Sequence, residues 1–434
     1  MRADRYIDGP PLGLDLYHEV ADLPIVSPHG HIPVELFAEP GARLEPPGRL
    51  FVGADHYVVR MLYSQGIPLE RIYGADDRDL WNLLVDNVRL FDLTPSGLWL
   101  RETLAGVFGI EEIGPDSYDR IEEQLASAAF LPHALLDRFR VECLATTDAA
   151  DASLELHRGL APRIRPTFRP DAVVALDAPG WAERVGTADY ASFVATLAKQ
   201  RAAFKAMGAT ATDHAATSAD TTRLSEAEAA TIFAAGLAGT ITFENARRFE
   251  AHMLNEFARM SVEDGLVMQL HIGSLRNHNL PLAAAFGPDI GADIPVATDW
   301  TRGLRPLLEA HGNDADFRLV LFTLDESTYS RELAPIAGHY PSVLLGCPWW
   351  FHDSPLGIER FLDRVVETAG IANLAGFVDD ARALTALPAR HDLWRRRTCG
   401  WLARKVEAGF VGEADARRIA RELAVDLARA SYRI

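Results

Sequence analysis

The segment Leu23-Pro24-Ile25-Val26-Ser27-Pro28-His29-Gly30-His31 indicates both how this chain folds and what it can bind. A short apolar run comes first, and two histidines separated by one residue follow it. If the run is a buried strand, residues i and i+2 point to the same face, so both imidazoles leave the strand end together, their backbones roughly 7 Å apart. Such a pair can bind one metal ion, as in metal-assisted barrel enzymes.

Seven further apolar or β-branched runs also end in chemically capable polar residues. Segments with helical spacing lie between most of them, as expected where crossover helices join parallel strands. The eight runs span Ile25 to His31, Glu142 to Asp148, Ile164 to Asp171, Ala209 to His214, Leu266 to Gly273, Phe317 to Asp325, Val343 to Phe351 and Leu374 to Arg382. The alternation predicts an α/β fold.

Within this class, we expect a distorted (β/α)8 TIM-like barrel. A doubly wound open sheet fits the same alternation of strands and helices. An open sheet, however, concentrates its functional residues at one switch point, whereas here they follow nearly every run. The distribution of polar strand ends therefore favours the barrel.

The chain of 434 residues is expected to form one barrel domain, 1–434, with two helical insertions. More than a hundred residues separate the first two runs, far more than a crossover needs. Helical periodicity, as in Leu80 and Leu84, predicts a helical insertion at 35–138 over the barrel mouth. A second helical insertion is expected at 215–262, and Ile419, Leu423 and Leu427 predict a packing helix near the end.

Composition excludes several classes of function. The content of 48% hydrophobic and 24% charged residues is typical of a globular protein, and a net charge of -18 disfavours a nucleic-acid binder. The three cysteines are too scattered for a disulfide framework. Without a long apolar run or an apolar leader, the sequence predicts no membrane association and a cytoplasmic location. It leaves open whether the chain forms a homo-oligomer.

Two other strand ends supply further metal-binding groups. His271 ends the fifth run, and Asp379 and Asp380 end the eighth. Any single histidine is more often a satisfied core or surface side chain than a ligand. Groups from separated strands converge only if the sheet closes, which a barrel provides. Neutral imidazole and carboxylate are the ligands of zinc and manganese sites, and three of them leave a position open for substrate.

Three arginines also follow strand ends. These are Arg169, Arg276 and Arg382. A guanidinium fork pairs naturally with a carboxylate, so they predict an acidic substrate. Each one alone is more often a member of a structural ion pair, but three such positions are harder to explain in that way.

The motifs together resemble those of uronate isomerases, in the amidohydrolase superfamily. The resemblance runs in order along most of the chain. Its pieces are Ser27-Pro28-His29-Gly30-His31, Asp55-His56-Tyr57, Thr146-Thr147-Asp148, Arg169-Pro170-Asp171, Thr212-Asp213-His214, His271-Ile272-Gly273-Ser274-Leu275-Arg276-Asn277, Trp349-Trp350-Phe351 and Asp380-Ala381-Arg382. The sequence differs from the family pattern at Gly30, where the family more often has cysteine, and at Pro28, where it more often has an aromatic residue.

The resemblance implies an aldose–ketose isomerase of hexuronate catabolism. Such enzymes interconvert D-glucuronate with D-fructuronate, and D-galacturonate with D-tagaturonate, by proton transfer through an enediol. The family holds one divalent metal ion, often zinc, with manganese as the alternative. Its ligands match His29, His31 and Asp380.

The resemblance also assigns roles around the metal ion. Tyr57 matches a tyrosine that moves the proton between the first two carbons, and Asp380 could act as a base for ring opening. A phenol is a poor base at neutral pH unless a neighbouring cation supports its anion, and Arg60 and His56 are near Tyr57 in sequence. His271 is left open as ligand or substrate contact. The remaining substrate-binding candidates are Arg169, Asp213, Arg276, Trp349, Trp350 and Arg382.

Two other functions compete with this interpretation. A metal-dependent hydrolase of the same superfamily would act on a lactone, ester or amide through metal-bound water. Hydrolysis of a neutral amide needs fewer carboxylate anchors, so the arginines and Tyr57 favour the isomerase. A barrel that only binds or regulates is disfavoured because every position needed for metal binding and proton transfer holds a suitable side chain.

Overall fold

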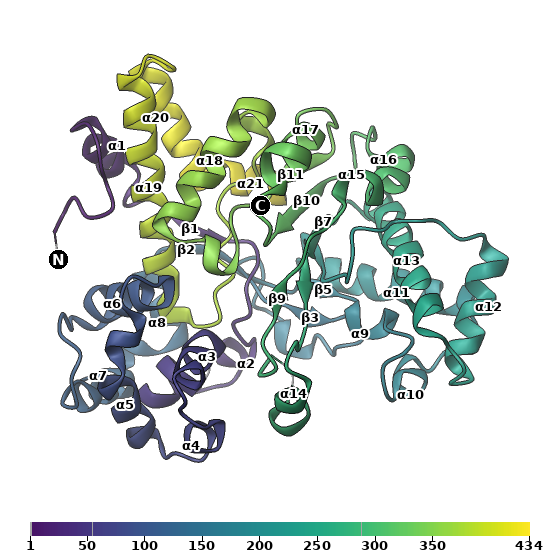
Figure 1. Cartoon of the computed structure of the whole chain (residues 1–434), viewed down its shortest axis with the longest axis horizontal. Coiled ribbons are helices and arrows are strands. Elements are labelled where there is room, and N and C mark those ends of the chain that lie inside the picture. Colours follow the sequence, from purple (N-terminus) through teal and green to yellow (C-terminus); the bar gives the residue numbers. More distant parts are fainter. Residues whose placement is uncertain (1, 54, 288) are drawn as a thin grey trace.

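The computed structural model describes residues 2–53, 55–287 and 289–434, with the side chain of Phe351 left aside. Parallel strands alternate with helices along the chain, which confirms the α/β prediction (Figure 1). The strands are β1 (Ile25–Ser27), β2 (Val141–Ala145), β3 (Asp148–Ala149), β4 (Ile164–Arg165), β5 (Phe168–Arg169), β6 (Ala211–His214), β7 (Val267–Ile272), β8 (Ser274–Leu275), β9 (Ile294–Pro295), β10 (Leu319–Thr323) and β11 (Val343–Leu345).

The strands form two parallel sheets and one short antiparallel pair. The first sheet has the order β1-β2-β4, the second β11-β10-β7-β6-β5-β3, and β8 pairs with β9. Two neighbouring stretches of chain continue from the first sheet into the second. Thr146 N–H donates to the Arg165 carbonyl at 2.9 Å, which extends the β2–β4 pair, and Asp148 N–H donates to the Thr167 carbonyl at 3.0 Å, which leads into the β3–β5 pair. Among the described residues, the hydrogen-bonded strands do not form one closed sheet.

The eighth predicted run, Leu374 to Arg382, is not a strand. It makes two single parallel bridges, one between Leu345 and Leu374 and one between Gly30 and Ala381. Gly376 has φ +81° and Asp380 φ +48°, both in the left-handed region, which interrupts the extended backbone that a ladder needs. A Cβ at residue 376 would also lie 2.5 Å from the Ala428 nitrogen, so only glycine fits this turn.

Helices fill the long segment between β1 and β2, and they share a core. Trp81, Leu62 and Leu104 lie at its centre with almost no exposed surface. In Figure 1 these helices gather on one side of the molecule, beside β1 and β2. They follow α1 (Leu12–Val20) and comprise α2 (Glu35–Ala38), α3 (His56–Ser64), α4 (Leu69–Tyr73), α5 (Asp77–Asp86), α6 (Pro95–Phe108), α7 (Ser117–Ala126) and α8 (Pro132–Arg138).

The remaining helices mostly connect the later strands or close the chain. They are α9 (Asp171–Val174), α10 (Trp181–Val185), α11 (Tyr190–Ala206), α12 (Glu226–Leu237), α13 (Phe243–Asp264), α14 (Leu280–Phe286), α15 (Trp300–Gly303), α16 (Arg305–His311), α17 (Ala334–Ala337), α18 (Pro355–Ala369), α19 (Leu387–Glu407), α20 (Glu413–Arg421) and α21 (Leu427–Tyr432). Near the end, Tyr432 donates a hydrogen bond of 2.8 Å to Gln269 on β7 and so fixes the last helix beneath the sheet.

Helix α13 shows how the sequence sets this packing. Thr242 caps its first turn, and Gly265 ends it with φ +75°. Phe249, Met253 and Phe257 recur at every fourth position and are fully buried. This apolar stripe packs on the sheet and holds β7 in place.

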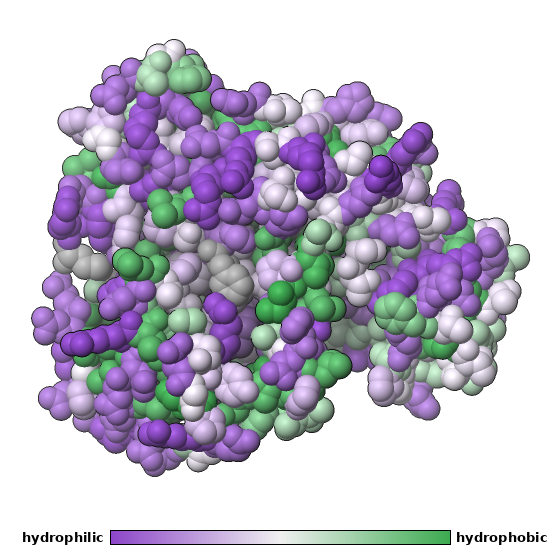
Figure 2. Space-filling model, in the orientation of Figure 1, coloured by the Kyte–Doolittle hydropathy of each residue, from purple (hydrophilic) through white to green (hydrophobic). Residues whose placement is uncertain are grey.

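The surface is mainly polar, with one apolar area near the β8–α14–β9 segment (Figure 2). Leu280 is 71% exposed there, with Leu275 and Ile294 about half exposed. No helix in the described residues is both long enough and apolar enough to cross a bilayer.

His214 makes the stability of the fold depend on pH. Its ring is buried between β6 and Phe257, 2.9 Å from the Thr212 hydroxyl, and burial lowers its pKa to about 3. The unfolded chain takes up this proton below about pH 6.5 and the folded chain does not, so stability falls as pH falls from about 6.5 towards 3.

We therefore expect His214→Gln to be less stable than wild type at pH 7 but less sensitive to acid. The difference in slope is at most about 1.4 kcal/mol per pH unit, the value for one proton. Urea unfolding of metal-free protein between pH 5 and 7 measures it. His339→Gln, at an exposed histidine, is the control. Equal slopes in wild type and His214→Gln would contradict the prediction.

Candidate metal and substrate site

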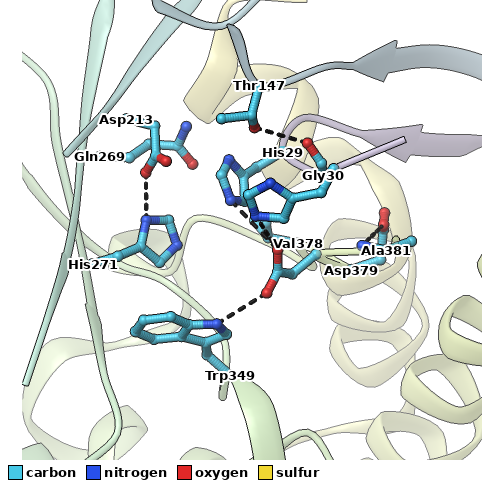
Figure 3. A network of polar contacts seen from close by, with 12 residues as sticks. His29, Gly30, Thr147, Asp213, Gln269, His271, Trp349, Val378, Asp379 and Ala381 are labelled. Carbon is cyan, nitrogen blue, oxygen red and sulfur yellow. Dashed lines mark hydrogen bonds and ion pairs between the residues drawn. The ribbon is translucent and has the colours of Figure 1, made fainter. Parts of the chain in front are cut away.

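His29 and His31 lie beyond the end of β1, as the spacing predicts, with ring centroids 5.2 Å apart. His29 is 2% exposed, whereas His31 is partly open to a cavity. The segment between them is fixed by the Thr147 hydroxyl, which donates a 2.8 Å hydrogen bond to the Gly30 carbonyl (Figure 3). Burial lowers the pKa of His29 to about 4, so its imidazole is neutral and able to act as a ligand.

The Asp380 carboxylate faces both histidines. Its Oδ1 lies 3.2 Å from His31 Nε2 and 3.5 Å from His29 Nε2, while Oδ2 accepts a 2.9 Å hydrogen bond from the Trp349 indole. Burial alone would raise the pKa of Asp380, but the His31 contact and the charges of His29 and Arg382 hold it well below its ordinary value. The group is therefore a carboxylate.

Asp213 and His271 form a second pair next to His29. His271 Nδ1 donates to Asp213 Oδ1 at 2.6 Å, as Figure 3 shows. An ionised carboxylate only accepts, so this bond fixes the proton on Nδ1 and leaves Nε2 of the neutral ring as an acceptor. The His271 ring stacks on Phe322 at 4.3 Å and on His29 at 4.7 Å, which sets its orientation.

These residues suit a divalent metal ion. Two groups have ligand atoms within 4.8 Å of one another: His29, His31 and Asp380, and His29, Asp213 and His271. Asp380 Oδ1 and His29 Nδ1 are buried without a hydrogen-bond partner among the described residues. Unsatisfied buried ligand atoms of these types are expected where an ion completes the site.

The three predicted arginines differ in their surroundings. Arg169 is held by two carboxylates, Asp171 at 2.6 Å and Asp213 at 3.2 Å. Arg276 pairs with Asp293 at 2.5 Å and lies 5.7 Å over the Trp350 ring. Arg382 is exposed and has no carboxylate within 4.0 Å among the described residues. Arg382 is therefore the guanidinium most available to a bound anion.

Tyr57 reaches the site from the first turn of α3. Asp55 caps that helix by accepting from the backbone N–H groups of Tyr57 and Val58. The phenol is 9% exposed, and burial, followed by the charges of Asp380 and Asp353, raises its pKa well above 10. His56 stacks beside it at 4.1 Å, but burial lowers the pKa of His56 to about 4, so this neighbour is neutral.

A cavity of about 240 Å³ brings most of the predicted residues together. The buried indoles of Trp349 and Trp350 form part of its wall. Tyr57 and His56 line a smaller neighbouring cavity that shares Trp350 and Asp289 with it. The main cavity is lined by His29, His31, Arg169, Asp213, His271, Arg276, Asp289, Trp349, Trp350, Asp380 and Arg382.

Sequence reasoning missed three charged residues near the site. Asp289 lies on the segment between β8 and β9, where no periodicity marks a functional position. Asp353 follows the double tryptophan by two residues, so its adjacency to Trp349-Trp350 was the available signal. Arg390 lies on α19 in an arginine-rich stretch typical of a surface helix.

Comparison with known proteins identifies the family. Residues 3–431 match the family model described as glucuronate isomerase. The uronate isomerase of Nostoc punctiforme is 49% identical over 99% of this chain and 98% of its own length. The crystal structure of glucuronate isomerase from Caulobacter crescentus superposes with a TM-score of 0.96 at 41% identity, covering 100% of this chain and 97% of that one.

The uronate isomerase structure from Thermotoga maritima gives a TM-score of 0.92 at 29% identity and covers 100% of this chain and 99% of that one. The likeness thus extends over the whole chain, including the segments that supply the ligand groups, the arginines and Tyr57. The chain therefore belongs to the uronate isomerase family of enzymes.

Proposed function

We propose that the chain interconverts D-glucuronate with D-fructuronate, and D-galacturonate with D-tagaturonate, in hexuronate catabolism. Membership of the uronate isomerase family gives the reaction class. The observation that supports the substrate most directly is one cavity that combines a His–Asp ligand group with three arginines. An acidic sugar has the oxygen donors and the carboxylate that such a cavity matches.

The strands would form a distorted (β/α)8 barrel in one domain, 1–434. Support comes from the continuation of the paired β2 and β4 stretches into the paired β3 and β5, and from the Gly30–Ala381 and Leu345–Leu374 bridges. The helices within 35–138 would be an insertion over the barrel mouth, and those within 215–262 a second one. This arrangement accounts for polar residues at the ends of several strands facing one cavity.

The metal ion would be divalent, zinc or alternatively manganese, held by His29, His31 and Asp380. This group is favoured over His29, Asp213 and His271 because Asp213 is already engaged by His271 and Arg169. His271 then contacts substrate through Nε2. When bound, the ion polarises substrate oxygens and favours the enediolate as a Lewis acid.

The arginines and tryptophans would position the sugar acid. Arg382, which pairs with no carboxylate in the described part of the chain, takes the substrate carboxylate, and Arg276 moves from Asp293 to a substrate oxygen. Arg169 and Asp213 hold each other and shape the floor of the cavity. The indoles of Trp349 and Trp350 pack against the apolar face of the sugar.

Proton transfer would use Asp380 and Tyr57. Asp380 takes the proton from the anomeric hydroxyl and returns it to the ring oxygen as the bond between that oxygen and C1 breaks. It acts through Oδ1, which has no hydrogen-bond partner among the described residues. Tyr57 then moves the proton from the second carbon to the first, with His56 packed against its ring. Both steps redistribute hydrogen within one molecule, so no redox cofactor takes part.

The activity itself is tested with zinc-loaded protein and each of the two aldoses. We expect the matching ketose to accumulate to an equilibrium mixture, followed by circular dichroism. The alternative, a metal-dependent hydrolase, predicts turnover of a lactone, ester or amide panel instead. Hydrolysis of that panel, with no ketose from either sugar, would overturn the proposed function.

Tyr57→Phe removes the hydroxyl but keeps the ring that packs at the site. We expect kcat to fall by about 10²- to 10⁴-fold, the usual contribution of a positioned acid–base group. The melting temperature and the near-ultraviolet dichroism establish that the variant folds. Tyr63→Phe, on the same helix at a 40% exposed position, is the control. Wild-type turnover in Tyr57→Phe would remove this residue from the mechanism.

The ligand assignment makes a separate prediction about zinc binding. His31→Ala should bind zinc more than about 100-fold less tightly, because even partners behind a ligand contribute about 10- to 100-fold. His271→Ala should keep about one zinc ion per chain. Elemental analysis after desalting, with chelator competition, measures both. Loss of zinc from His271→Ala but not from His31→Ala would place the ion in the other group.

A further inference from the structure

Arg390 and Asp353 form a buried ion pair beside Tyr57. Arg390 Nη1 lies 2.7 Å from Asp353 Oδ2, and the two side chains are only 12% and 9% exposed. Asp353 follows the tryptophan pair, whereas Arg390 comes from the first turn of α19. The pair therefore joins two segments at the back of the site.

Arg390 is held in one orientation by contacts on several sides. Its guanidinium lies 4.0 Å over the Trp99 ring and donates a 2.9 Å hydrogen bond to the Asp379 carbonyl. Trp99 belongs to α6, within the long helical segment. A guanidinium fixed by an aromatic face, a carbonyl and a carboxylate has little freedom to turn away.

A small cavity of about 60 Å³ separates Arg390 from Tyr57. Both residues line it, together with Asp380, Arg382 and Asp55. Its other lining residues are Leu50, Trp350, Ala383 and Ala386. The space is large enough for ordered water with several polar partners. Arg390 and Tyr57 thus line one cavity that is too small to hold a hexuronate.

Charges of both signs act on the buried phenol from four parts of the chain. Asp380 and Asp353 oppose its ionisation, whereas Arg390 and Arg382 favour it. On its own helix, Asp55 lies at the cap, Arg60 interacts with the phenol, and His56 is neutral. Arg390, Arg382 and Arg60 are the cations that favour the phenolate. Of these, Arg382 also lines the main cavity, where the substrate carboxylate would engage it.

We propose that Arg390 is a positioning residue whose fixed charge stabilises the Tyr57 phenolate during proton transfer. The inference rests on the proposed role of Tyr57. The phenol first loses its proton to water. The phenolate then takes the proton from the second carbon, and the electron pair of that C–H bond forms the C1–C2 double bond. The electrons of the carbonyl π bond move onto its oxygen, which takes the proton of the hydroxyl on the second carbon.

In the second half, the resulting enediolate collapses towards the ketose. The negative oxygen on the second carbon forms the carbonyl, the electron pair of the C1–C2 double bond takes the phenol proton onto the first carbon, and the phenolate is restored. Arg390 touches neither carbon. Its contribution is electrostatic, because an anion created in a buried site is far less stable without a fixed neighbouring cation.

Arg390→Gln tests the role of the charge. We expect kcat to fall about 10- to 100-fold with KM changed less than about threefold, and the acid limb of the kcat profile to move up by about one pH unit. The C2-deuterium isotope effect on kcat should rise because proton abstraction becomes slower. Arg390→Lys, which keeps the charge, should recover most of kcat.

Arg395→Gln is the matched control. Arg395 is also a buried arginine of α19, but its hydrogen bonds go to the Ala21 and Pro24 carbonyls, away from Tyr57. It should lower stability without changing the acid limb or the isotope effect. The proposal is overturned if Arg390→Gln keeps wild-type kcat and pH profile, or if Arg395→Gln reproduces its shifts.

Asp353→Asn removes a negative charge near the phenol, so it tests a shift of the acid limb in the opposite direction. This test remains available if the Arg390→Gln variant does not fold. Removing a carboxylate that opposes the phenolate should move the acid limb of kcat to lower pH. A shift to higher pH, or no shift, contradicts the proposal. Full activity in Tyr57→Phe would refute the Tyr57 mechanism itself. If Tyr57→Phe loses activity while the Arg390 and Asp353 variants keep the wild-type kcat and pH profile, only this inference is refuted.

Discussion

The carboxylate of Asp380 joins the parts of the site that are most distant in sequence. One oxygen faces the two histidines after β1, and the other accepts the Trp349 indole. The backbone repeats the same connection, since His31 N–H donates to the Ala381 carbonyl at 2.8 Å. A Cβ on Gly30 would meet that carbonyl at 3.1 Å, so the missing side chain eases this close approach. His29, His31 and Asp380 come together because the segment after β1 lies against the segment that contains Asp380 and Ala381.

The residues at strand ends could be predicted from the sequence, because a strand orients its side chains with a period of two. His29, His31 and His271 follow apolar runs, and the structure brings all three to within contact of carboxylates. The α/β class follows from the same alternation. The prediction of a strand for the eighth run was wrong, since its backbone is left-handed at Gly376 and Asp380. Gly376 lies close to Ala428 of α21, a tertiary contact that no local sequence pattern indicates.

Charged residues supplied by helices could not be predicted in this way. The stretch Arg395-Arg396-Arg397 and the nearby Arg390 have the composition of a solvated helix face, yet all are largely buried. Arg395 and Arg397 donate to backbone carbonyls near the start of the chain, and Arg390 pairs with Asp353 on another segment. Burial of a charge is decided by such tertiary partners, and the charge alone does not indicate it.

Helix α3 links the two hydrophobic cores, which explains why the long helical segment matters to the site. Val58, Val59 and Leu62 pack into the core of that segment, whereas Tyr57 packs with Trp99 and Trp350 in the core of the strands. Tyr57 and Val58 are adjacent in sequence, but the helix directs them towards different cores, so that Val58 is structural and Tyr57 is reactive. Asp55 fixes that rotation by capping Tyr57 and Val58. Because the same segment supplies Trp99 beneath Arg390, both the phenol and its neighbouring cation depend on how it packs against the strands.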